Sequence, residues 1–396
     1  MATHEVSLAS GSRDILAADW FTSACVAFCA ANAVLLFAAW HASDGTPTDF
    51  VGVWAAGRLV LDGQPQTAYD ASAHKAVEDL AAGFAFRGYY AWLYPPTFLP
   101  VATLLALVPY GVAHLIWPPL TACAYLATIR AIIRHRSAIL LCAAFPAIVA
   151  NIAAEQNGFL SAALLGGALI LMERRPALSG CLLGLLTYKP QLGLLIPLAL
   201  IAGGQWRVLG SAAAVATALA AASWAAFGSA TWIAFANSAL FASRAFLAED
   251  AANWHKLQTV FGLVRSLGGS ESIAWLLHAA TLGATALVIW VIWRRPIAFE
   301  AKAAALAAAS LLATPYLYAY DLVVLAVPIA FLIRLGQTSG FLPGELAGIA
   351  AAGFLVLAIP LVAVPIGVVA TVIVLLLIAR RALPVGCPVT ARSSRI

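Results

Sequence analysis

Long apolar runs recur along the whole of this sequence, and they limit its fold more than any other feature. Apolar stretches of roughly 20 residues are what a helix needs to cross a bilayer. Only 10% of the residues are charged, whereas a soluble domain carries about 25%. We therefore predict an all-α, polytopic integral membrane protein with about 12 transmembrane helices. The apolar runs fall at 20–41, 110–133, 137–154, 157–172, 177–189, 190–204, 208–227, 271–293, 299–318, 320–334, 345–360 and 362–379.

Basic residues between these runs set the predicted orientation, because cytoplasmic loops carry the excess of Lys and Arg. With both termini in the cytoplasm, every arginine cluster falls on the inner side. The net charge of +5 therefore reports orientation and not a nucleic-acid partner. The clusters comprise Arg130, Arg134, Arg136, Arg174, Arg175, Arg207, Arg294, Arg295, Arg334, Arg380 and Arg381.

This orientation depends on one short segment, 95–108, which has prolines near both ends. At about 14 residues it is short for a span. We predict that it lies at the outer face as a re-entrant or interfacial helix. If it crosses, the topology inverts from that point and the arginine clusters move outside.

The chain is predicted to form a single membrane-embedded domain over 1–396, since no internal repeat interrupts it. Two long outer loops, 42–109 and 228–270, are expected to carry short amphipathic helices, and 382–396 forms a cytoplasmic tail. The high Ala content and the preference for Arg over Lys are typical of a bacterial protein. We therefore expect a multi-pass protein of the bacterial inner membrane.

Local patterns predict helices inside the first outer loop. One covers 49–61 and ends at the turn Asp-Gly-Gln-Pro at 62–65, and a second covers 71–82. The apolar runs 177–189 and 190–204 are short for spans, at about 13 to 15 residues. This thin pair predicts a pinched region near the outer face, where a lipid could approach.

Five polar motifs all fall at the predicted outer membrane face. Ionisable groups at membrane depth are costly and usually functional, so we expect one site that opens to the periplasm or exterior. No spacing among His, Cys and Asp suits a metal ion, and no cofactor-binding motif is evident. The motifs are TDFVGVWAAGR (48–58), WLYPP (92–96), EQNG (155–158), TYKPQ (187–191) and TPYLYAYD (314–321).

Acidic and basic residues in the first outer loop have two interpretations each. Asp49 is placed either to cap the following helix or to accept a proton from a hydroxyl, and the two roles are compatible. Arg58 either pairs with Asp62 one turn away or binds an anionic phosphate through its guanidinium fork. Asp70 is expected to cap the helix over 71–82.

Lys189 is the only cation in the short outer loops. It either snorkels to the interface or binds a phosphate, and Asp321 near the membrane needs a partner. The remaining polar residues also have structural alternatives: a tight turn at EQNG, an interfacial tyrosine belt, and an incidental histidine in the second loop. The predicted substrate-binding residues are Tyr94, Glu155, Gln156, Asn157, Tyr188, Gln191, His255, Lys256, Tyr316, Tyr318 and Asp321.

Taken in order, several stretches resemble glycosyltransferase family 87, integral membrane enzymes of the GT-C type that include polyprenyl-phosphomannose-dependent mannosyltransferases. The resemblance covers about 45–330. The chain departs from it where Tyr316 and Tyr318 replace a histidine that family members often carry. The stretches are DFVGVWAAGRLVLDGQPQTAYD, YPP, EQNGFLSAALL, RRPALSGCLLGLLTYKPQLGLLIPLALIAGGQWR and ATPYLYAYDLVVLA.

The resemblance implies a sugar donor linked to polyprenyl phosphate, transfer on the extracytoplasmic face, and a catalytic acidic residue in the first outer loop. Asp49 is the matching position. In an inverting transfer a carboxylate deprotonates the acceptor hydroxyl, which attacks the anomeric carbon opposite the leaving phosphate. Lys189 and Arg58 are the predicted partners of that phosphate. The expected partners are thus the lipid-linked donor, a lipid or glycan acceptor, and the bilayer.

A membrane transporter or a flippase for lipid-linked sugars is the alternative. Transporters usually bind near the midplane between repeated halves, whereas these polar motifs gather at one face. The sequence leaves open the acceptor, the sugar and the oligomeric state.

Overall fold

The computed structural model describes residues 15–247 and 254–382, so the predicted tail beyond Ala382 lies outside it. The described residues form α-helices and short 3-10 helices joined by loops. The α-helices are α1 (Asp19–Ala42), α2 (Phe50–Leu61), α3 (Ala71–Ala82), α4 (Leu99–Ala106), α5 (Tyr110–Ile133), α6 (Ala138–Ala144), α7 (Ala147–Ala154), α8 (Gly158–Leu171), α9 (Pro176–Leu185), α10 (Ile196–Ala202), α11 (Trp206–Leu247), α12 (Val260–Ser266), α13 (Glu271–Arg294), α14 (Phe299–Leu312), α15 (Ala326–Ser339), α16 (Glu345–Ala358) and α17 (Gly367–Ala382).

The 3-10 helices lie where α-helices break or begin, and several of them flank the polar motifs. They are η1 (Ile15–Ala17), η2 (Pro65–Tyr69), η3 (Pro96–Phe98), η4 (Leu186–Tyr188), η5 (Pro190–Gly193), η6 (Trp254–Lys256), η7 (Ala319–Leu325) and η8 (Ile359–Leu361). The predicted helix over 71–82 is confirmed as α3, and the one over 49–61 begins one residue later than expected.

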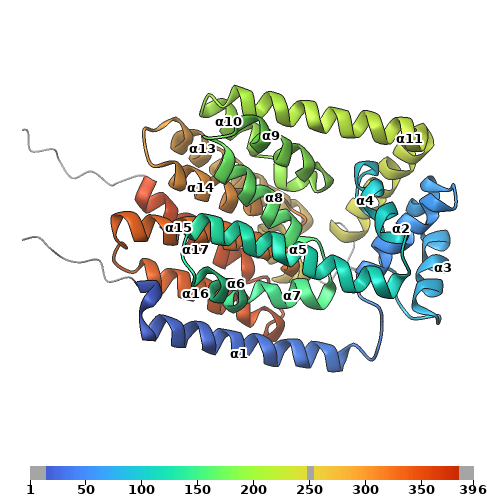
Figure 1. The fold of residues 1–396 in the computed structure, drawn as a ribbon, viewed down its shortest axis with the longest axis horizontal. Coiled ribbons are helices and arrows are strands. Elements are labelled where there is room, and N and C mark those ends of the chain that lie inside the picture. Colours follow the sequence, from blue (N-terminus) through green and yellow to red (C-terminus); the bar gives the residue numbers. More distant parts are fainter. Residues whose placement is uncertain (1–14, 248–253, 383–396) are drawn as a thin grey trace, which may run out of the picture.

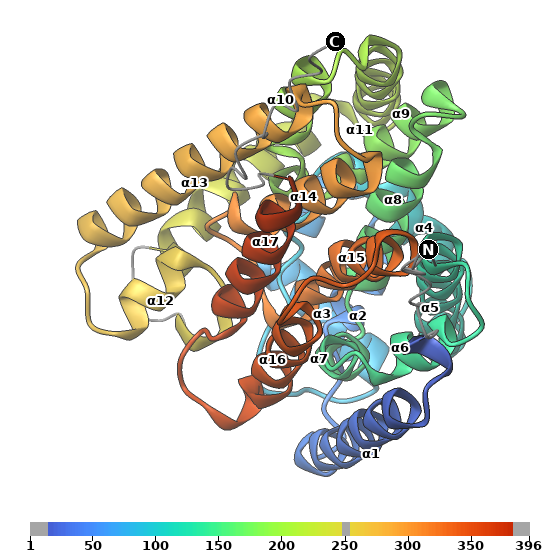
Figure 2. The same cartoon turned by 90° about the vertical axis from the view of Figure 1, so that its left-hand side faces the viewer.

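The helices pack as a bundle with an Ala-rich centre. Every residue of α14 from Ala303 onward is buried, because its small side chains let the neighbouring helices approach closely. The end-on view shows α1 and α13 at the edge of the molecule (Figure 2). These outer helices expose large apolar side chains such as Phe37, Trp40 and Leu287, which lipid can cover and water cannot.

Within the described residues, five helices are each long and apolar enough to cross a membrane. The other apolar helices are shorter or broken, so the count of twelve crossings stays a prediction, while the class of helical membrane protein holds. The five are Asp19–Ala42, Tyr110–Ile133, Trp206–Phe241, Glu271–Arg294 and Ala319–Ser339.

Three expected segments differ from the structure. The run 299–318 is helical only to Leu312, because Pro315 cannot continue the hydrogen-bond ladder. The second outer loop is largely helix: α11 passes through a kink at Gly228 and runs on to Leu247. In the first loop α2 is not amphipathic, since nine of its twelve residues are buried.

The buried helix α2 packs against α4 from the segment 95–108. Gly57 allows this close contact, because a Cβ added there would lie 2.0 Å from the carbonyl oxygen of Ala102. With eight residues, α4 is about 12 Å long, far short of the roughly 30 Å of a bilayer core. This length agrees with the prediction that the segment does not cross.

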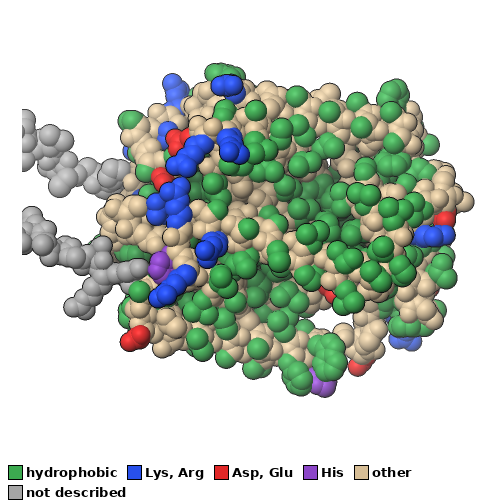
Figure 3. Space-filling model, viewed as in Figure 1, with side chains coloured by type: hydrophobic (Ala, Val, Ile, Leu, Met, Phe, Trp, Pro, Cys, Tyr) green, Lys and Arg blue, Asp and Glu red, His purple; other side chains and the backbone are tan. Residues whose placement is uncertain are grey.

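Charge is distributed unevenly along the bundle. The start of α1 and the end of α17 both lie at the end of the bundle opposite α2, α3 and α4 (Figure 1). Lys and Arg side chains gather toward that same terminal end, while the middle of the visible face is mainly apolar (Figure 3).

Candidate functional site

Asp49 stands at the N-cap position of α2, but its side chain makes no capping hydrogen bond. The capping interpretation of this carboxylate is therefore wrong. Instead, the Gln156 side chain donates a hydrogen bond from Nε2 to Asp49 Oδ2 at 2.8 Å. The first outer loop is thus joined to the turn between α7 and α8, and the carboxylate is partly buried.

A chain of hydrogen bonds fixes the Gln156 amide in this orientation. The Tyr94 hydroxyl donates to Gln156 Oε1 at 2.8 Å, and Asn157 Nδ2 donates to the Tyr94 oxygen at 3.0 Å. The Trp117 indole then donates to Asn157 Oδ1 at 2.9 Å. With its carbonyl oxygen occupied, Gln156 presents its NH₂ group to Asp49. The sequence predicted Tyr94, Gln156 and Asn157 for the site, and the structure brings them together.

Glu155 supplies a second carboxylate beside Asp49. Its Oε2 accepts a hydrogen bond from Thr48 Oγ1 at 2.7 Å and lies 2.8 Å from His114 Nδ1. Its φ of 52° is left-handed, a conformation that costs energy in a non-glycine residue and is frequent at functional sites. His114 was not predicted, because a single histidine in an apolar helix gives no sequence signal.

Lys189 and Asp321 form a buried ion pair, with Nζ 2.5 Å from Oδ1 and side chains only 5% and 6% exposed. The lysine therefore does not snorkel, and it is the partner that Asp321 was expected to need. The other carboxylate oxygen of Asp321 accepts from the Tyr318 backbone N–H at 3.2 Å. Lys189 turns inward because the backbone breaks between η4 and η5, where its φ and ψ are −121° and 73°.

The second outer loop reaches the same cluster through its backbone. Leu257 and Tyr318 form an isolated antiparallel bridge, and the Gln258 N–H donates to the Leu317 carbonyl at 2.8 Å. This pairing holds η6, with His255 and Lys256, beside the tyrosine segment. Residues from both outer loops and from the α9–α10 break thus converge.

The electrostatics of Asp49 combine opposing effects. Burial raises the pKa of its carboxyl above the ordinary value, while the Gln156 hydrogen bond and the charges of Lys256 and Lys189 lower it. Burial is the largest of these effects. A carboxylate with a raised pKa is a stronger base, and groups of this kind are concentrated in active sites.

Some predicted site residues lie apart from this cluster or are engaged elsewhere. Arg58 pairs with the exposed Asp62 at 3.0 Å, and it lies about 13 Å along the helix from Asp49. Tyr188, by contrast, does reach the cluster: its hydroxyl donates to the Asn157 carbonyl oxygen at 3.1 Å and lies 2.7 Å from Ser161 Oγ, and its ring centroid is 6.0 Å from that of Tyr94. Gln191 is partly buried in η5, and Tyr316 precedes the Leu257–Tyr318 bridge.

The predicted helix cap by Asp70 is confirmed. Its side chain accepts hydrogen bonds from the backbone N–H groups of Ser72 and Ala73 at the start of α3.

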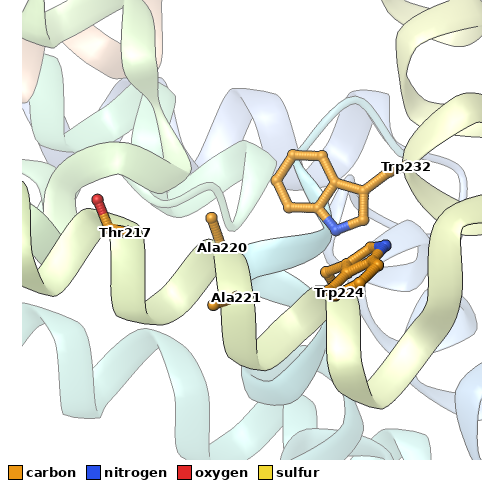
Figure 4. A pocket seen from close by; sticks show the side chains of 5 residues that line it. All are labelled: Thr217, Ala220, Ala221, Trp224 and Trp232. Carbon is orange, nitrogen blue, oxygen red and sulfur yellow. The ribbon is translucent and has the colours of Figure 1, made fainter.

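A separate apolar hollow of about 350 Å³ lies along α11 beside the Gly228 kink. Trp224 and Trp232 face it, together with Thr217 and two alanines (Figure 4). It shares no lining residue with the Asp49 cluster. Its walls suit a hydrocarbon chain and offer almost nothing to the hydroxyls of a sugar. Within the described residues, no group of three or more His, Cys, Asp or Glu could hold a metal ion.

The family model of glycosyltransferase family 87 matches residues 92–315, more than half of the chain. The chain belongs to glycosyltransferase family 87. No curated protein and no solved structure matches it. Membership makes the protein a glycosyltransferase and removes the transporter alternative. The matched region includes Tyr94, Gln156 and Lys189, whereas Asp49 precedes it and Asp321 follows it.

Proposed function

We propose that this family 87 glycosyltransferase moves a hexose, with mannose as the first candidate, from a polyprenyl-phosphate-linked donor to a lipid or glycan acceptor. Transfer takes place at the extracytoplasmic membrane face and inverts the anomeric centre. The observation that carries the proposal is the convergence of Asp49 with two cations. Both Lys189 and Lys256 lie close enough to lower the pKa of its carboxyl.

In this mechanism Asp49 is the general base. The acceptor oxygen forms a bond to the anomeric carbon on the face opposite the phosphate, and its proton moves to the Asp49 carboxylate. The bond between the anomeric carbon and the phosphate oxygen breaks, and its electron pair stays on the phosphate. Gln156, held by Tyr94, keeps the carboxylate oriented through the bond of 2.8 Å.

The leaving phosphate gains negative charge and needs cations. The Lys189 ammonium has three N–H donors, and one of them is directed to Asp321. Within the described residues its other donors have no hydrogen-bond partner, so they are available to phosphate oxygens while Asp321 holds the side chain in place. Lys256 is the second cation in this proposal. It replaces Arg58, which pairs with Asp62 at the far end of α2.

The proposed membrane arrangement keeps the twelve crossings and places both termini in the cytoplasm of a bacterial inner membrane. The basic residues gathered at the terminal end support it, as does the position of α2, α3 and α4 at the other end (Figures 1 and 3). A lipid-linked donor enters from the bilayer. The broken helices around Lys189 support an entrance near that residue.

The test is transfer of label from radioactive polyprenyl-phosphomannose to an acceptor in lipid extract by the purified protein. We expect a labelled product from the wild type. Asp49→Asn should slow its formation by about 10²- to 10⁴-fold, the usual contribution of a general base. Asp62→Asn is the matched control, because it changes an exposed carboxylate at the other end of the same helix. Full activity in Asp49→Asn, or no product from any polyprenyl-phosphosugar, contradicts the proposal.

A further inference from the structure

A fully buried histidine and glutamate face each other beneath the Asp49 turn, and the proposed chemistry does not use them. His74 and Glu78 lie one turn apart on α3, both with no exposed side-chain surface. His74 Nδ1 is 3.3 Å from Glu78 Oε1. The spacing alone resembles an ordinary ion pair on a helix surface, such as Lys75 with Asp79, so the sequence gives no sign of this burial.

Each side of this pair holds a backbone group from a different segment. His74 Nε2 lies 3.0 Å from the Gly52 carbonyl oxygen of α2. Since a carbonyl only accepts, Nε2 carries a proton and donates it. Glu78 Oε1 accepts from the backbone N–H of Tyr90 at 3.0 Å. The pair therefore ties α2 and the segment before Trp92 to α3.

The His74–Glu78 contact is an ion-pair distance of 3.3 Å between Nδ1 and Oε1, and neither His74 Nδ1 nor Glu78 Oε2 has a hydrogen-bond partner among the described residues. A proton placed between Nδ1 and the carboxyl oxygen keeps two bare lone pairs from facing each other. One shared proton gives either an imidazolium with a carboxylate or a neutral imidazole with a carboxylic acid, and both forms have no net charge. A pair without net charge is the form that a fully buried position tolerates.

Tyr90 extends this arrangement to both sides of Asp49. Its hydroxyl donates to the Pro47 carbonyl at 2.6 Å, two residues before the carboxylate. Its backbone lies against Gly52, three residues after it: a Cβ on Gly52 would be 2.4 Å from the Tyr90 carbonyl oxygen. Burial, followed by the nearby Asp49 charge, raises the pKa of Tyr90, which agrees with this closeness.

We propose that His74 and Glu78 are positioning residues for Asp49: by holding the Gly52 carbonyl and the Tyr90 N–H, they fix the turn that presents the carboxylate to Gln156. This inference rests on the proposed function, since it takes Asp49 as the base. A misplacement of about 1 Å costs on the order of 10²-fold in rate. The pair thus acts on the chemical step without contacting either substrate.

The test compares kcat and KM for mannosyl transfer in His74→Leu, His74→Gln and Lys75→Met. His74→Leu removes both ring nitrogens and should lower kcat by on the order of 10²-fold, with KM for the donor within about twofold. His74→Gln keeps a donor near the Nε2 position and should recover most of the rate. Lys75→Met breaks the neighbouring, partly exposed ion pair with Asp79 on the same helix and should retain wild-type kcat.

Further variants keep the inference testable if His74→Leu does not fold. Gly52→Ala pushes the Tyr90 carbonyl away while leaving His74 and Glu78 intact, and it should lower kcat in the same way. A wild-type kcat in folded His74→Leu or in Gly52→Ala overturns the positioning role. So does an equal loss in His74→Leu and His74→Gln. These outcomes leave the proposed function standing, which fails separately if the wild type forms no product or if Asp49→Asn remains active.

Discussion

Replacing Lys189 with methionine should strongly destabilise the protein, because it leaves Asp321 charged and buried. In the native structure the two side chains are 5% and 6% exposed, so water cannot replace the lost ammonium. Among the residues that the structure describes, the carboxylate then keeps only the Tyr318 N–H, at 3.2 Å. Removing one partner of a buried ion pair costs about 3–5 kcal/mol. We expect a loss of this size in the free energy of unfolding.

The exposed pair of Arg58 and Asp62 provides the control. Its side chains are 46% and 42% exposed, and exposed pairs one helical turn apart are worth about 0.3–0.5 kcal/mol. Arg58→Gln should therefore melt close to the wild type. The double variant Lys189→Met with Asp321→Leu should recover much of the lost stability, since replacing both buried charges by apolar groups is often nearly neutral.

The assay is thermal unfolding of the purified protein in detergent at one fixed scan rate, because large proteins often unfold irreversibly. Mannosyl transfer is measured on the same samples. We expect the double variant to melt near the wild type and yet to transfer poorly, since in the proposed mechanism the Lys189 ammonium binds the donor phosphate. The reasoning is refuted if Lys189→Met melts like Arg58→Gln, or if the double variant transfers at the wild-type rate.

Three further predictions concern pH, packing and topology. Gln156→Leu removes a hydrogen bond that lowers the pKa of Asp49. Because the proposed base works in its deprotonated form, the acid limb of the kcat/KM profile should move to higher pH. An acid limb that stays in place or moves to lower pH counts against the assignment of Asp49 as the base. Gly57→Ala places a Cβ 2.0 Å from the Ala102 carbonyl oxygen of α4. This clash should lower the free energy of unfolding by about 1–3 kcal/mol, which thermal melting measures. An unchanged melting temperature contradicts this packing of α2 against α4. In a cysteine-free background, the Gln64→Cys variant should react with an impermeant maleimide from outside the cell, and the Arg174→Cys variant only from inside. The reverse labelling pattern would invert the predicted topology.

The sequence by itself determined the features that depend on neighbouring residues. Apolar run length and scarce charge predicted helices in a membrane, and the ends of most runs agree with the structure. Asp70 followed by a helical pattern predicted the α3 cap, which its bonds to Ser72 N and Ala73 N confirm. The ordered motifs also predicted the family, which the match over 92–315 confirms. Each of these signals is carried by residues close together along the chain.

The tertiary structure decided which side chains meet. Gln156 reaches Asp49 across 107 positions, and Lys189 reaches Asp321 across 132. No local pattern encodes such pairs, because they depend on how broken helices and loops fold back on the bundle. Burial was likewise decided by packing. The spacing of His74 and Glu78 is that of a surface ion pair, yet α2 and the Tyr90 segment cover it completely, so its chemistry is set by contacts that only the folded chain creates.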